Sequence, residues 1–421
     1  MRQAAQASDL PLSDIVRSLH APHPASAAAG ARPRVTLLLG SLDGGGAERV
    51  AVNLARRCDP EAVDVRLALL RRQGAYLDEV EADRIDAAPA RPGAVTRAIA
   101  APADIAAMLR RSRTDVLMSF GLGVNMQTWL ALQALGRRRP RWICREDNNL
   151  DAEIGGVAKD PVSRAVALAA ARKVYRSADA FVAVAHELGD LLRRRVGFDD
   201  ERLSVIHNPI DLAEIERRAM EPLPVIPMRP YVVTAGRMVW QKGFDVLIRA
   251  FAACPSAAGL DLVILGDGPL EADLRRLAAE CGVAERVLFP GFQPNPWSWF
   301  ARSSLFVLSS RWEGFGNVVA EAMACGAPAL VTDCNYGPRE QVAHGRSGWV
   351  APAEDPLALA SAMDQLLSQP DLTQKLAAAG RLRARAFDVD AIATAYTDLF
   401  LAQAGAPASA WPAPRDRRAA I

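Results

Sequence analysis

Two basic side chains, Arg237 and Lys242, stand five positions apart in a segment that ends at Gly243. An arginine presents a planar fork of donors and a lysine a point charge, so both can bind one phosphate-bearing group. Lysine is rare in this chain: only four of the 50 Lys and Arg residues are lysines, and the other three lie in stretches typical of surface helices. The alternative interpretation is a pair of ordinary loop cations.

Two carboxylates, Glu313 and Glu321, stand eight positions apart in a second segment. They would repel one shared phosphate, but each can accept hydrogen bonds from hydroxyls, which favours two polyol rings on either side of an anion. Gly314 and Gly316 would let backbone N–H groups approach a ligand, and the start of a helix favours an anion. The alternative is a capped helix with one surface glutamate.

The residues around these glutamates predict a strand, a loop and a helix. Residues 305–308 form a short apolar run, typical of a strand buried on both faces. Asn317 can cap a helix that continues to residue 325 and ends at Gly326. Residues 329–333 predict the next strand, so the glutamate loop would lie at the carboxyl end of a parallel strand, where open α/β sheets bind ligands.

The whole chain alternates between strand-like and helix-like segments, which predicts two α/β units with parallel sheets covered on both faces. The strands are expected at 34–40, 63–70, 116–120, 141–145, 180–185, 203–206, 231–235, 260–265, 286–289, 305–308 and 329–333. The helices are expected at 47–57, 101–113, 124–136, 161–176, 187–196, 244–254, 269–281, 296–302, 317–325, 356–368, 371–386 and 389–401. The domain boundaries that follow are a flexible N-terminal arm (1–33), a first domain (34–210), a proline-rich linker (211–230), a second domain (231–388), a C-terminal helix (389–403) and a disordered tail (404–421).

A glycine turn, Gly44-Gly45-Gly46, separates the first expected strand from its helix and can cradle a phosphate. It matches neither G-x-G-x-x-G nor the ending of a P-loop. The missing dinucleotide fingerprint disfavours an NAD-dependent oxidoreductase.

Composition excludes several classes of function. A net charge of +2 on 421 residues is too small to indicate a nucleic-acid-binding protein. The chain has no run of about 18 apolar residues, and we expect no secretory signal because residues 1–33 lack a compact apolar core after a basic start. The six scattered cysteines lack a C-x-x-C pair, which fits reduced thiols in a cytosol and argues against a zinc site. Arginine clusters at 137–141 and 193–195 predict either a solvated face or contact with an anionic membrane.

Residues 313–326, Glu-Gly-Phe-Gly-Asn-Val-Val-Ala-Glu-Ala-Met-Ala-Cys-Gly, resemble the signature of the family 4 retaining glycosyltransferases, bacterial polysaccharide and lipopolysaccharide type. Further segments match in order: 43–49, 207–211, 236–245, 266–269, 290–292 and 337–340. The resemblance covers roughly residues 34–400. It implies the GT-B fold, in which two Rossmann-like, doubly wound domains face a central cleft. The first domain would bind the acceptor and the second the nucleotide-sugar, and the C-terminal helix would cross back to the first domain.

The same resemblance assigns roles to the candidate residues. Arg237 and Lys242 would bind the donor diphosphate and stabilise the leaving group, while Glu313 would bind the donor sugar, and these three form the catalytic set. Glu321 would bind the nucleotide ribose. Further donor contacts would come from the loop, helix start and base-side turn: Gly314, Phe315, Gly316, Asn317, Val318, Gly291 and Phe292. The turn at 266–269 is interpreted as structural.

The mechanism implied by the resemblance needs no metal or other cofactor, because cations and helix N–H groups would neutralise the departing diphosphate. No carboxylate nucleophile is evident in the matched motifs, and the resemblance implies attack from the leaving-group face, assisted by the diphosphate itself. The first domain departs from many relatives, which carry a histidine after a strand where this chain reads Ser119 to Asn125 without one. We expect Asn125 to take that polar role, and the segment 145–149 to help shape the acceptor side.

The sequence therefore predicts a cytoplasmic transferase of a UDP-hexose or UDP-N-acetylhexosamine, acting in cell-surface glycan synthesis at the inner face of the membrane. Its acceptor would be a lipid-linked oligosaccharide or a polysaccharide, as in lipopolysaccharide and exopolysaccharide assembly. The alternatives are a GDP-mannose-dependent mannosyltransferase and a non-catalytic nucleotide-sugar-binding subunit.

Overall fold

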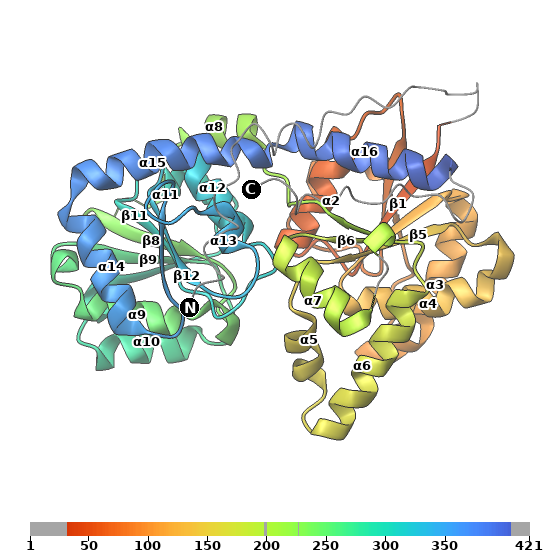
Figure 1. Ribbon diagram of the computed structural model, residues 1–421, viewed down its shortest axis with the longest axis horizontal. Helices are drawn as coiled ribbons and strands as arrows, with labels where there is room; N and C mark the ends of the chain where they lie inside the picture. The colour runs from red at the N-terminus through yellow and green to blue at the C-terminus, as the bar shows by residue number, and fades with distance from the viewer. Residues whose placement is uncertain (1–31, 198–199, 226, 406–421) are drawn as a thin grey trace. The chain divides into compact units, whose positions relative to one another are not determined.

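The computed structural model describes residues 32–197, 200–225 and 227–405 (Figure 1). The expected flexible arm and disordered tail fall almost entirely outside these ranges. The chain divides into two compact units. The N-terminal unit contains the described residues up to Pro209 together with those from Val389 onward, and the C-terminal unit contains Ile210–Asp388.

The N-terminal unit is built on a seven-stranded parallel sheet with the order β3-β2-β1-β4-β5-β6-β7. Its strands are β1 Arg34–Leu39, β2 Asp64–Leu69, β3 Ile85–Ala87, β4 Val116–Phe120, β5 Arg141–Glu146, β6 Ala180–Ala183 and β7 Leu203–Val205. Its helices are α2 Gly46–Arg57, α3 Ala94–Ser112, α4 Leu122–Leu135, α5 Leu150–Val157, α6 Pro161–Arg176, α7 His186–Val196 and α16 Val389–Gly405.

The C-terminal unit is built on a six-stranded parallel sheet with the order β10-β9-β8-β11-β12-β13. Its strands are β8 Tyr231–Ala235, β9 Asp261–Leu265, β10 Val287–Gly291, β11 Leu305–Leu308, β12 Ala329–Asp333 and β13 Trp349–Pro352. Its helices are α8 Leu212–Ala219, α9 Phe244–Ala253, α10 Glu271–Glu280, α11 Trp297–Phe300, α12 Asn317–Ala324, α13 Pro338–Gln341, α14 Pro356–Ser368 and α15 Pro370–Ala384.

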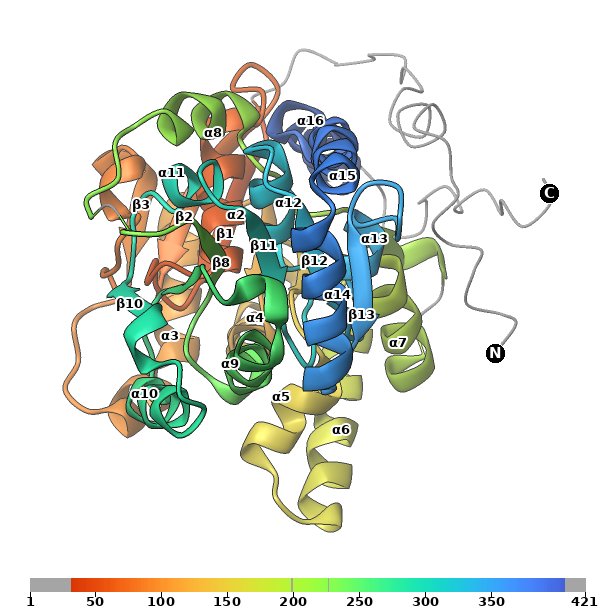
Figure 2. The ribbon, with the colours of Figure 1, turned by 90° about the vertical axis from the view of Figure 1, so that its left-hand side faces the viewer.

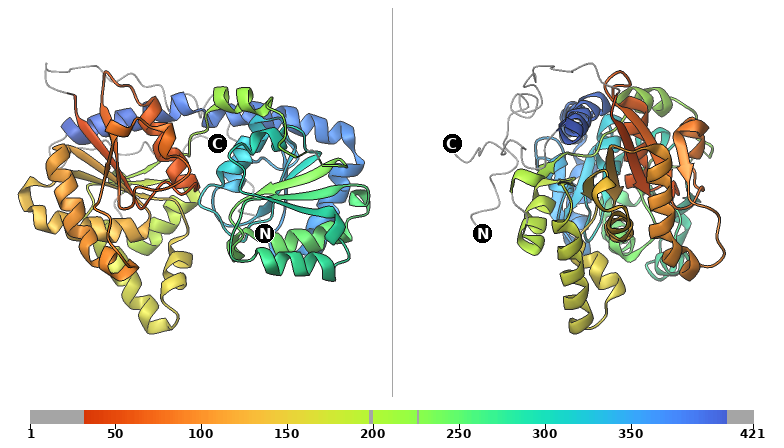
Figure 3. Two further views of the ribbon diagram at one scale, coloured as in Figure 1. Left: turned by 180° about the vertical axis from the view of Figure 1, so that it is seen from behind. Right: turned by 90° about the vertical axis from the view of Figure 1, so that its right-hand side faces the viewer.

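Helices cover both faces of each sheet, as the alternating pattern predicts. In the C-terminal unit, α9 and α10 lie on one face and α11 and α12 on the other (Figures 1 and 2). In the N-terminal unit, red α2 and blue α16 lie on one face and orange α3 on the other, which is also visible from behind in Figure 3. Strands buried from both sides explain the continuous Val and Leu runs of the sequence.

The C-terminal helix α16 belongs to the N-terminal unit, although it follows the whole C-terminal unit in sequence. It packs on α2, and the side chains of Ile392, Tyr396 and Phe400 lie in the same hydrophobic core as strands β1, β2 and β4. A helix with these apolar positions would expose a large apolar stripe without this sheet beneath it. The hydrophobic core of the N-terminal unit therefore includes side chains from α16, the last described helix of the chain.

The segment 211–230, expected to be a linker, instead contains helix α8. Asp211 caps this helix by accepting a hydrogen bond from the backbone N–H of Glu214, and α8 packs against α11 and α12. The prolines that suggested a linker follow the helix and do not interrupt it. The short elements β3, β13, α5 and α13 were also missed, because each has too few residues for a recognisable periodicity.

Helix α3 begins at Ala94, seven residues before the expected start. Pro102 lies in the interior of α3. Within the described residues, no helix combines the length and the apolar character that crossing a bilayer requires.

Candidate functional site

The two candidate loops of the C-terminal unit follow neighbouring strands. The loop with Arg237 and Lys242 follows β8, the loop with Glu313 follows β11, and β8 pairs with β11 in parallel. Since parallel strands end at the same edge of the sheet, these loops meet although they lie about seventy residues apart in sequence.

The central contact of the site is an ion pair between Lys242 and Glu313. The Lys242 Nζ atom lies 2.7 Å from Glu313 Oε1, and the Ser310 hydroxyl donates to the same oxygen at 2.6 Å. The Lys242 side chain is 18% exposed and that of Glu313 only 5%. The structure therefore brings together two of the three predicted catalytic residues, and it adds Ser310, which the sequence analysis did not single out.

Glycine residues allow the close approach that this ion pair needs. Gly243, which ends the lysine loop, has φ +61°, and a Cβ atom there would lie 2.1 Å from the carbonyl oxygen of Ser309. The Ser309 hydroxyl in turn donates to the carbonyl of Lys242 at 3.0 Å. Any larger residue at position 243 would push the two loops apart.

Arg311, which lies in the glutamate loop, holds that loop to the segment with Lys242 through a second set of contacts. Its guanidinium forms a two-pronged ion pair with Asp245 at 2.9 and 2.8 Å, contacts Glu354 at 2.9 Å, and lies 3.3 Å from the centre of the Trp240 ring. Burial would raise the pKa of Asp245, but the Arg311 charge and hydrogen bonds outweigh it and hold that pKa below its usual value. Sequence reasoning missed Arg311 because its partners come from two separate segments, one with Trp240 and Asp245 and one with Glu354.

Glu321 lies on α12 and accepts a hydrogen bond from Trp297 of α11. The Trp297 indole Nε1 donates to Glu321 Oε2 at 3.2 Å, and the guanidinium of Arg218 lies 5.1 Å from the centre of a Trp297 ring. Trp297 is buried, whereas Glu321 is half-buried. One carboxylate oxygen is thus oriented by a rigid indole donor, which sets the direction of the side chain.

The loop between β11 and α12 differs in detail from its expected form. Gly316, with φ +80°, precedes the helix, and Asn317 is the first helical residue instead of the expected cap. The Gln341 amide donates to the carbonyls of Phe315 and Gly316, which fixes the loop backbone. Phe315 is 2% exposed and packs edge-on against Phe387 at 5.3 Å, so its ring belongs to the interior of the unit.

Gly337 places the segment 337–340 against this loop. It has φ +73°, and a Cβ atom there would lie 2.4 Å from the Cα atom of Phe315. The turn at 266–269 makes a similar contact with the lysine loop, because the N–H of Met238 donates to the carbonyl of Asp267 at 2.6 Å. Both glycine-containing motifs therefore position backbone, in agreement with the structural interpretation of the turn at 266–269.

The remaining donor candidates lie at or near the surface. Arg237 is exposed, and its side chain makes no hydrogen bond or ion pair with any residue of the described ranges. Gly291 ends β10 with φ +77°, and Phe292 is 41% exposed. Val318 is half-buried in the first turn of α12.

In the N-terminal unit, the glycine turn is placed as expected, at the end of β1. Gly45 is the N-cap of α2, and Gly46 is its first residue. Asn125, in contrast, is fully buried: its Oδ1 accepts from the Ser119 hydroxyl at 2.6 Å and its Nδ2 donates to the carbonyl of Arg145 at 3.3 Å. The expectation that Asn125 faces an acceptor is therefore wrong, and its amide instead joins β4 to β5.

The segment 145–149 begins in the interior. Arg145 is fully buried, and its guanidinium contacts Asp147, the Tyr396 hydroxyl at 3.0 Å and the Asn208 Oδ1 at 2.5 Å. On the opposite side of β5, Glu146 accepts from the Tyr175 hydroxyl. Arg145 therefore ties the end of β5 to α16, which is a structural role.

Two carboxyls beside this strand have raised pKa values. Burial and the neighbouring Glu153 raise the pKa of Glu146 well above its usual value. Burial and the charge of Asp147 raise the pKa of Glu153 to about 7. Both carboxyls thus favour the protonated form because the surrounding protein replaces water.

Comparison with known proteins agrees with this geometry. The model of Glycosyltransferase Family 4 matches residues 44–214, and the model of Glycosyl transferases group 1 matches residues 216–383. The chain belongs to glycosyltransferase family 4 and has the GT-B fold. The two matches together extend over most of both units.

Curated relatives are similar to parts of the chain. An N-acetylgalactosamine-N,N'-diacetylbacillosaminyl-diphospho-undecaprenol 4-alpha-N-acetylgalactosaminyltransferase of Campylobacter jejuni is 30% identical over 188 residues, covering 45% of this chain and 50% of the relative. The lipopolysaccharide core biosynthesis glycosyltransferase LpsE of Rhizobium meliloti is 36% identical over 171 residues, covering 40% and 49%. The chain thus matches about half the length of these relatives.

Among solved structures, Anabaena Alr3699/HepE in complex with UDP-glucose superposes with a TM-score of 0.71 at 19% identity. The match covers 87% of this chain and 98% of that one. At this identity the likeness establishes the fold alone.

Proposed function

We propose that this protein is a glycosyltransferase that moves a sugar from a nucleotide-sugar to an acceptor in bacterial lipopolysaccharide or polysaccharide synthesis. The observation that carries the proposal is the shielded ion pair between Lys242 and Glu313, held by two glycine-containing loops at the carboxyl edge of the sheet. Family membership and the presence of glycosyltransferases of these pathways among the relatives support it.

Breaking the bond between the sugar and the diphosphate places negative charge on the leaving group. Lys242 would neutralise that charge from a fixed position, because its side chain is held by Glu313 and by the tight loop before Gly243. Arg237, exposed in the same loop, would add a second cation with a planar fork. Glu313 would then serve two purposes: it orients Lys242, and it accepts hydrogen bonds from donor-sugar hydroxyls.

The nucleoside part of the donor would lie toward α11 and α12. Glu321, oriented by the indole of Trp297, would accept hydrogen bonds from the two ribose hydroxyls. Exposed Phe292, just after β10, would pack against the base. This arrangement uses a rigid donor to fix a carboxylate, so the ribose contact requires little reorganisation.

UDP is the nucleotide we propose, since a protein of the same fold has been solved with UDP-glucose. The sugar would be a hexose or N-acetylhexosamine, with GDP-mannose as the alternative donor. The acceptor would be a lipid-linked oligosaccharide or a polysaccharide; one relative carries diphospho-undecaprenol in its name. We further propose transfer with retention, without a metal ion, at the inner face of the cytoplasmic membrane.

Nucleotide binding and turnover test this proposal separately. The full-length protein is mixed with UDP, GDP, ADP or NAD, and thermal shift identifies the nucleotide that stabilises it. UDP release from a panel of UDP-sugars, with and without EDTA, then measures turnover. We expect stabilisation by UDP and sugar-dependent UDP release that EDTA does not reduce.

Variants link the activity to the site. Lys242→Ala and Glu313→Ala should each reduce turnover by at least about 100-fold, the usual effect of losing one preorganised charge-stabilising group. Lys375→Ala is the matched control, because Lys375 is an exposed lysine on α15 of the same unit. Full turnover by either site variant would refute the assignment. Tight UDP binding without turnover of any donor would instead favour the non-catalytic subunit.

A further inference from the structure

A hollow of about 280 Å³ lies in the N-terminal unit at the carboxyl ends of three adjacent strands. Its floor is formed by the residues that directly follow β1, β2 and β3, and its walls by α3 and α4. Its lining residues are Gly40, Leu70, Arg71, Ala88, Pro89, Arg91, Arg97, Ala98, Ala101, Asp104 and Gln127. This is the edge at which open parallel sheets bind ligands, and the volume approaches that of small-molecule sites, about 300 Å³ and above.

The charges around the hollow are unbalanced. Three arginines and one aspartate line it, which leaves an excess of two positive charges. Arg91 is neutralised, because its guanidinium forms a two-pronged pair with Asp104 at 3.0 and 2.9 Å. Among the described residues, the Arg97 guanidinium contacts no carboxylate, and it donates a hydrogen bond to the carbonyl of Arg91 at 3.2 Å. Arg71 lies 3.4 Å from Asp43, and both side chains are more than 40% exposed, so this contact contributes little.

The side chain of Gln127 on α4 lines the same hollow. Among the described residues, Gln127 Oε1 on α4 is shielded from solvent and has no hydrogen-bond partner. A buried acceptor without a donor is costly, and native proteins rarely retain one unless something else supplies the donor. The hollow thus combines Arg97, which contacts no carboxylate among the described residues, and Arg71, whose ion pair with Asp43 is exposed and screened, with the polar side chain of Gln127, which suits a hydroxyl.

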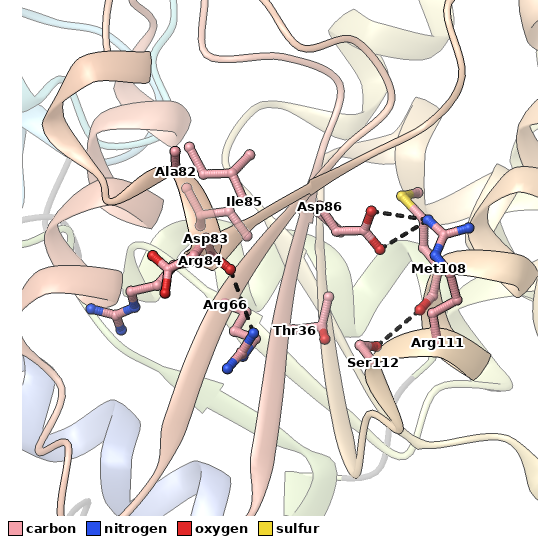
Figure 4. A pocket seen from close by; sticks show the side chains of 12 residues that line it. Thr36, Arg66, Ala82, Asp83, Arg84, Ile85, Asp86, Met108, Arg111 and Ser112 are labelled. Carbon is pink, nitrogen blue, oxygen red and sulfur yellow. Dashed lines mark hydrogen bonds and ion pairs between the residues drawn. The ribbon is translucent and has the colours of Figure 1, made fainter.

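A second hollow in the same unit shows that this charge pattern is not a general feature of its surface. It measures about 340 Å³ and lies along β2, β3 and the end of α3 (Figure 4). Its Arg111 is paired with Asp86 through two contacts at 2.9 and 3.0 Å, as Figure 4 shows, and its Arg66 is paired with Asp64 at 3.1 Å. Three arginines and two aspartates line the larger hollow, an excess of one positive charge compared with two in the smaller hollow, so the larger one is the weaker candidate for an anion site.

We propose that the smaller hollow binds a phosphate-bearing sugar of the acceptor, with Arg71 and Arg97 on the phosphate and Gln127 on a sugar hydroxyl. The assignment to the acceptor rests on the proposed transferase function, whereas phosphate binding itself follows from the residues of this unit alone. The phosphate can belong to a lipid diphosphate or to a phosphorylated sugar of a polysaccharide. Both sources present the same chemistry to a guanidinium.

Calorimetric titration of the full-length protein with inorganic phosphate tests the site. Saturating UDP is present so that the phosphate site of the donor is occupied. The variants are Arg97→Met and Arg71→Met, which keep much of the aliphatic side chain, and Arg97→Lys, which keeps the charge. Arg111→Met is the matched control, because it removes an arginine from the same helix, α3, outside the hollow. Circular dichroism and melting curves establish that every variant is folded.

We expect each methionine variant to weaken phosphate binding by about tenfold or more, the usual effect of losing one hydrogen bond to a charged group. Arg97→Lys should retain most of the binding, and Arg111→Met should bind phosphate as the wild type does. Gln127→Leu should leave inorganic phosphate binding unchanged but weaken binding of a hexose 1-phosphate. Equal phosphate binding by all variants would overturn the proposal, as would the absence of phosphate binding by the wild type.

Two further arms identify the source of the phosphate. A hexose linked to a short prenyl diphosphate is compared with a hexose 1-phosphate as a competitor of inorganic phosphate, and the tighter competitor indicates the acceptor type. Failure of UDP to bind would count against the proposed function, and weaker phosphate binding in Arg71→Met and Arg97→Met but not in Arg111→Met would still assign the phosphate to this hollow. Conversely, UDP binding and turnover with unchanged affinities in Arg71→Met and Arg97→Met would reject this site while retaining the transferase.

Discussion

Removal of Lys242 should cost the protein stability as well as activity. Lys242→Met leaves the Glu313 carboxylate, 5% exposed, with the Ser310 hydroxyl but without its cation. Removing one partner of a buried ion pair costs about 3–5 kcal/mol, because the other charge stays buried and uncompensated. The Lys242 side chain is 18% exposed, so water screens part of this penalty and we expect the lower end, about 3 kcal/mol. For a domain of this size that corresponds to a decrease of roughly 6–12 °C in Tm.

The penalty arises from the carboxylate, so a second substitution should remove it. In Lys242→Met/Glu313→Gln, a neutral amide replaces the buried charge and can still accept a hydrogen bond from Ser310. We expect this double variant to regain about 2 kcal/mol relative to Lys242→Met. The double-mutant cycle consists of the wild type, Lys242→Met, Glu313→Gln and the double variant. Melting curves and denaturant titrations measure the stability of each. Two results would refute the reasoning that Lys242 and Glu313 form a buried, coupled ion pair. One is a Tm of Lys242→Met equal to that of the wild type, and the other is a double variant no more stable than Lys242→Met.

Three other measurements test separate features. Trp297→Phe removes the donor that orients Glu321, so UDP affinity should fall a few-fold while Tm changes little; unchanged affinity would count against the ribose contact. Glu153→Gln should reduce the pH dependence of the stability of the protein. Burial raises the pKa of Glu153 to about 7, so folding favours the protonated carboxyl. The wild type should therefore lose stability, relative to the variant, as pH rises from about 4.5 to about 7. Denaturant titrations at about pH 5 and about pH 8 measure the change in stability of each protein, and an equal change in the wild type and the variant would contradict the prediction. Burial raises the pKa of both Cys58 and Cys334 to about 12, so mass spectrometry should find neither alkylated by iodoacetamide at about pH 8 unless denaturant is added.

The sequence predicts the framework of the C-terminal unit well because its signals are local. The apolar run of β11, the glycines at 314 and 316 and the stop at Gly326 each act within a few residues, and all appear where expected. The position of Asn317 inside α12 shows the limit of such signals: an asparagine favours a cap, but Gly316 already supplies the backbone turn.

The contacts of the site could not be read from spacing. Lys242 and Glu313 were identified separately, as a diphosphate ligand and a sugar ligand, and only the pairing of β8 with β11 shows that they contact each other. Arg145 illustrates the same limit, because its partner Tyr396 lies 251 residues away on a helix that returns to the N-terminal unit. Asn125 was expected to take the polar role of a histidine that many relatives carry in this segment, yet its amide joins two strands.

The glycines in the motifs that resemble the family signature have two different structural roles: some allow a close approach of backbone, and one allows a positive φ. At Gly243 and Gly337, a Cβ atom would collide with backbone of a neighbouring loop, so these glycines set the distance between loops. At Gly316, a Cβ atom would meet only side-chain atoms at ordinary contact distance, and the requirement comes from its positive φ at the start of α12. In the proposed mechanism, charge stabilisation would fall mainly to Lys242 and Arg237, whereas Gly243 would determine where Lys242 lies. It follows that substituting a loop glycine should disturb donor binding through the position of Lys242, and not through loss of a direct contact.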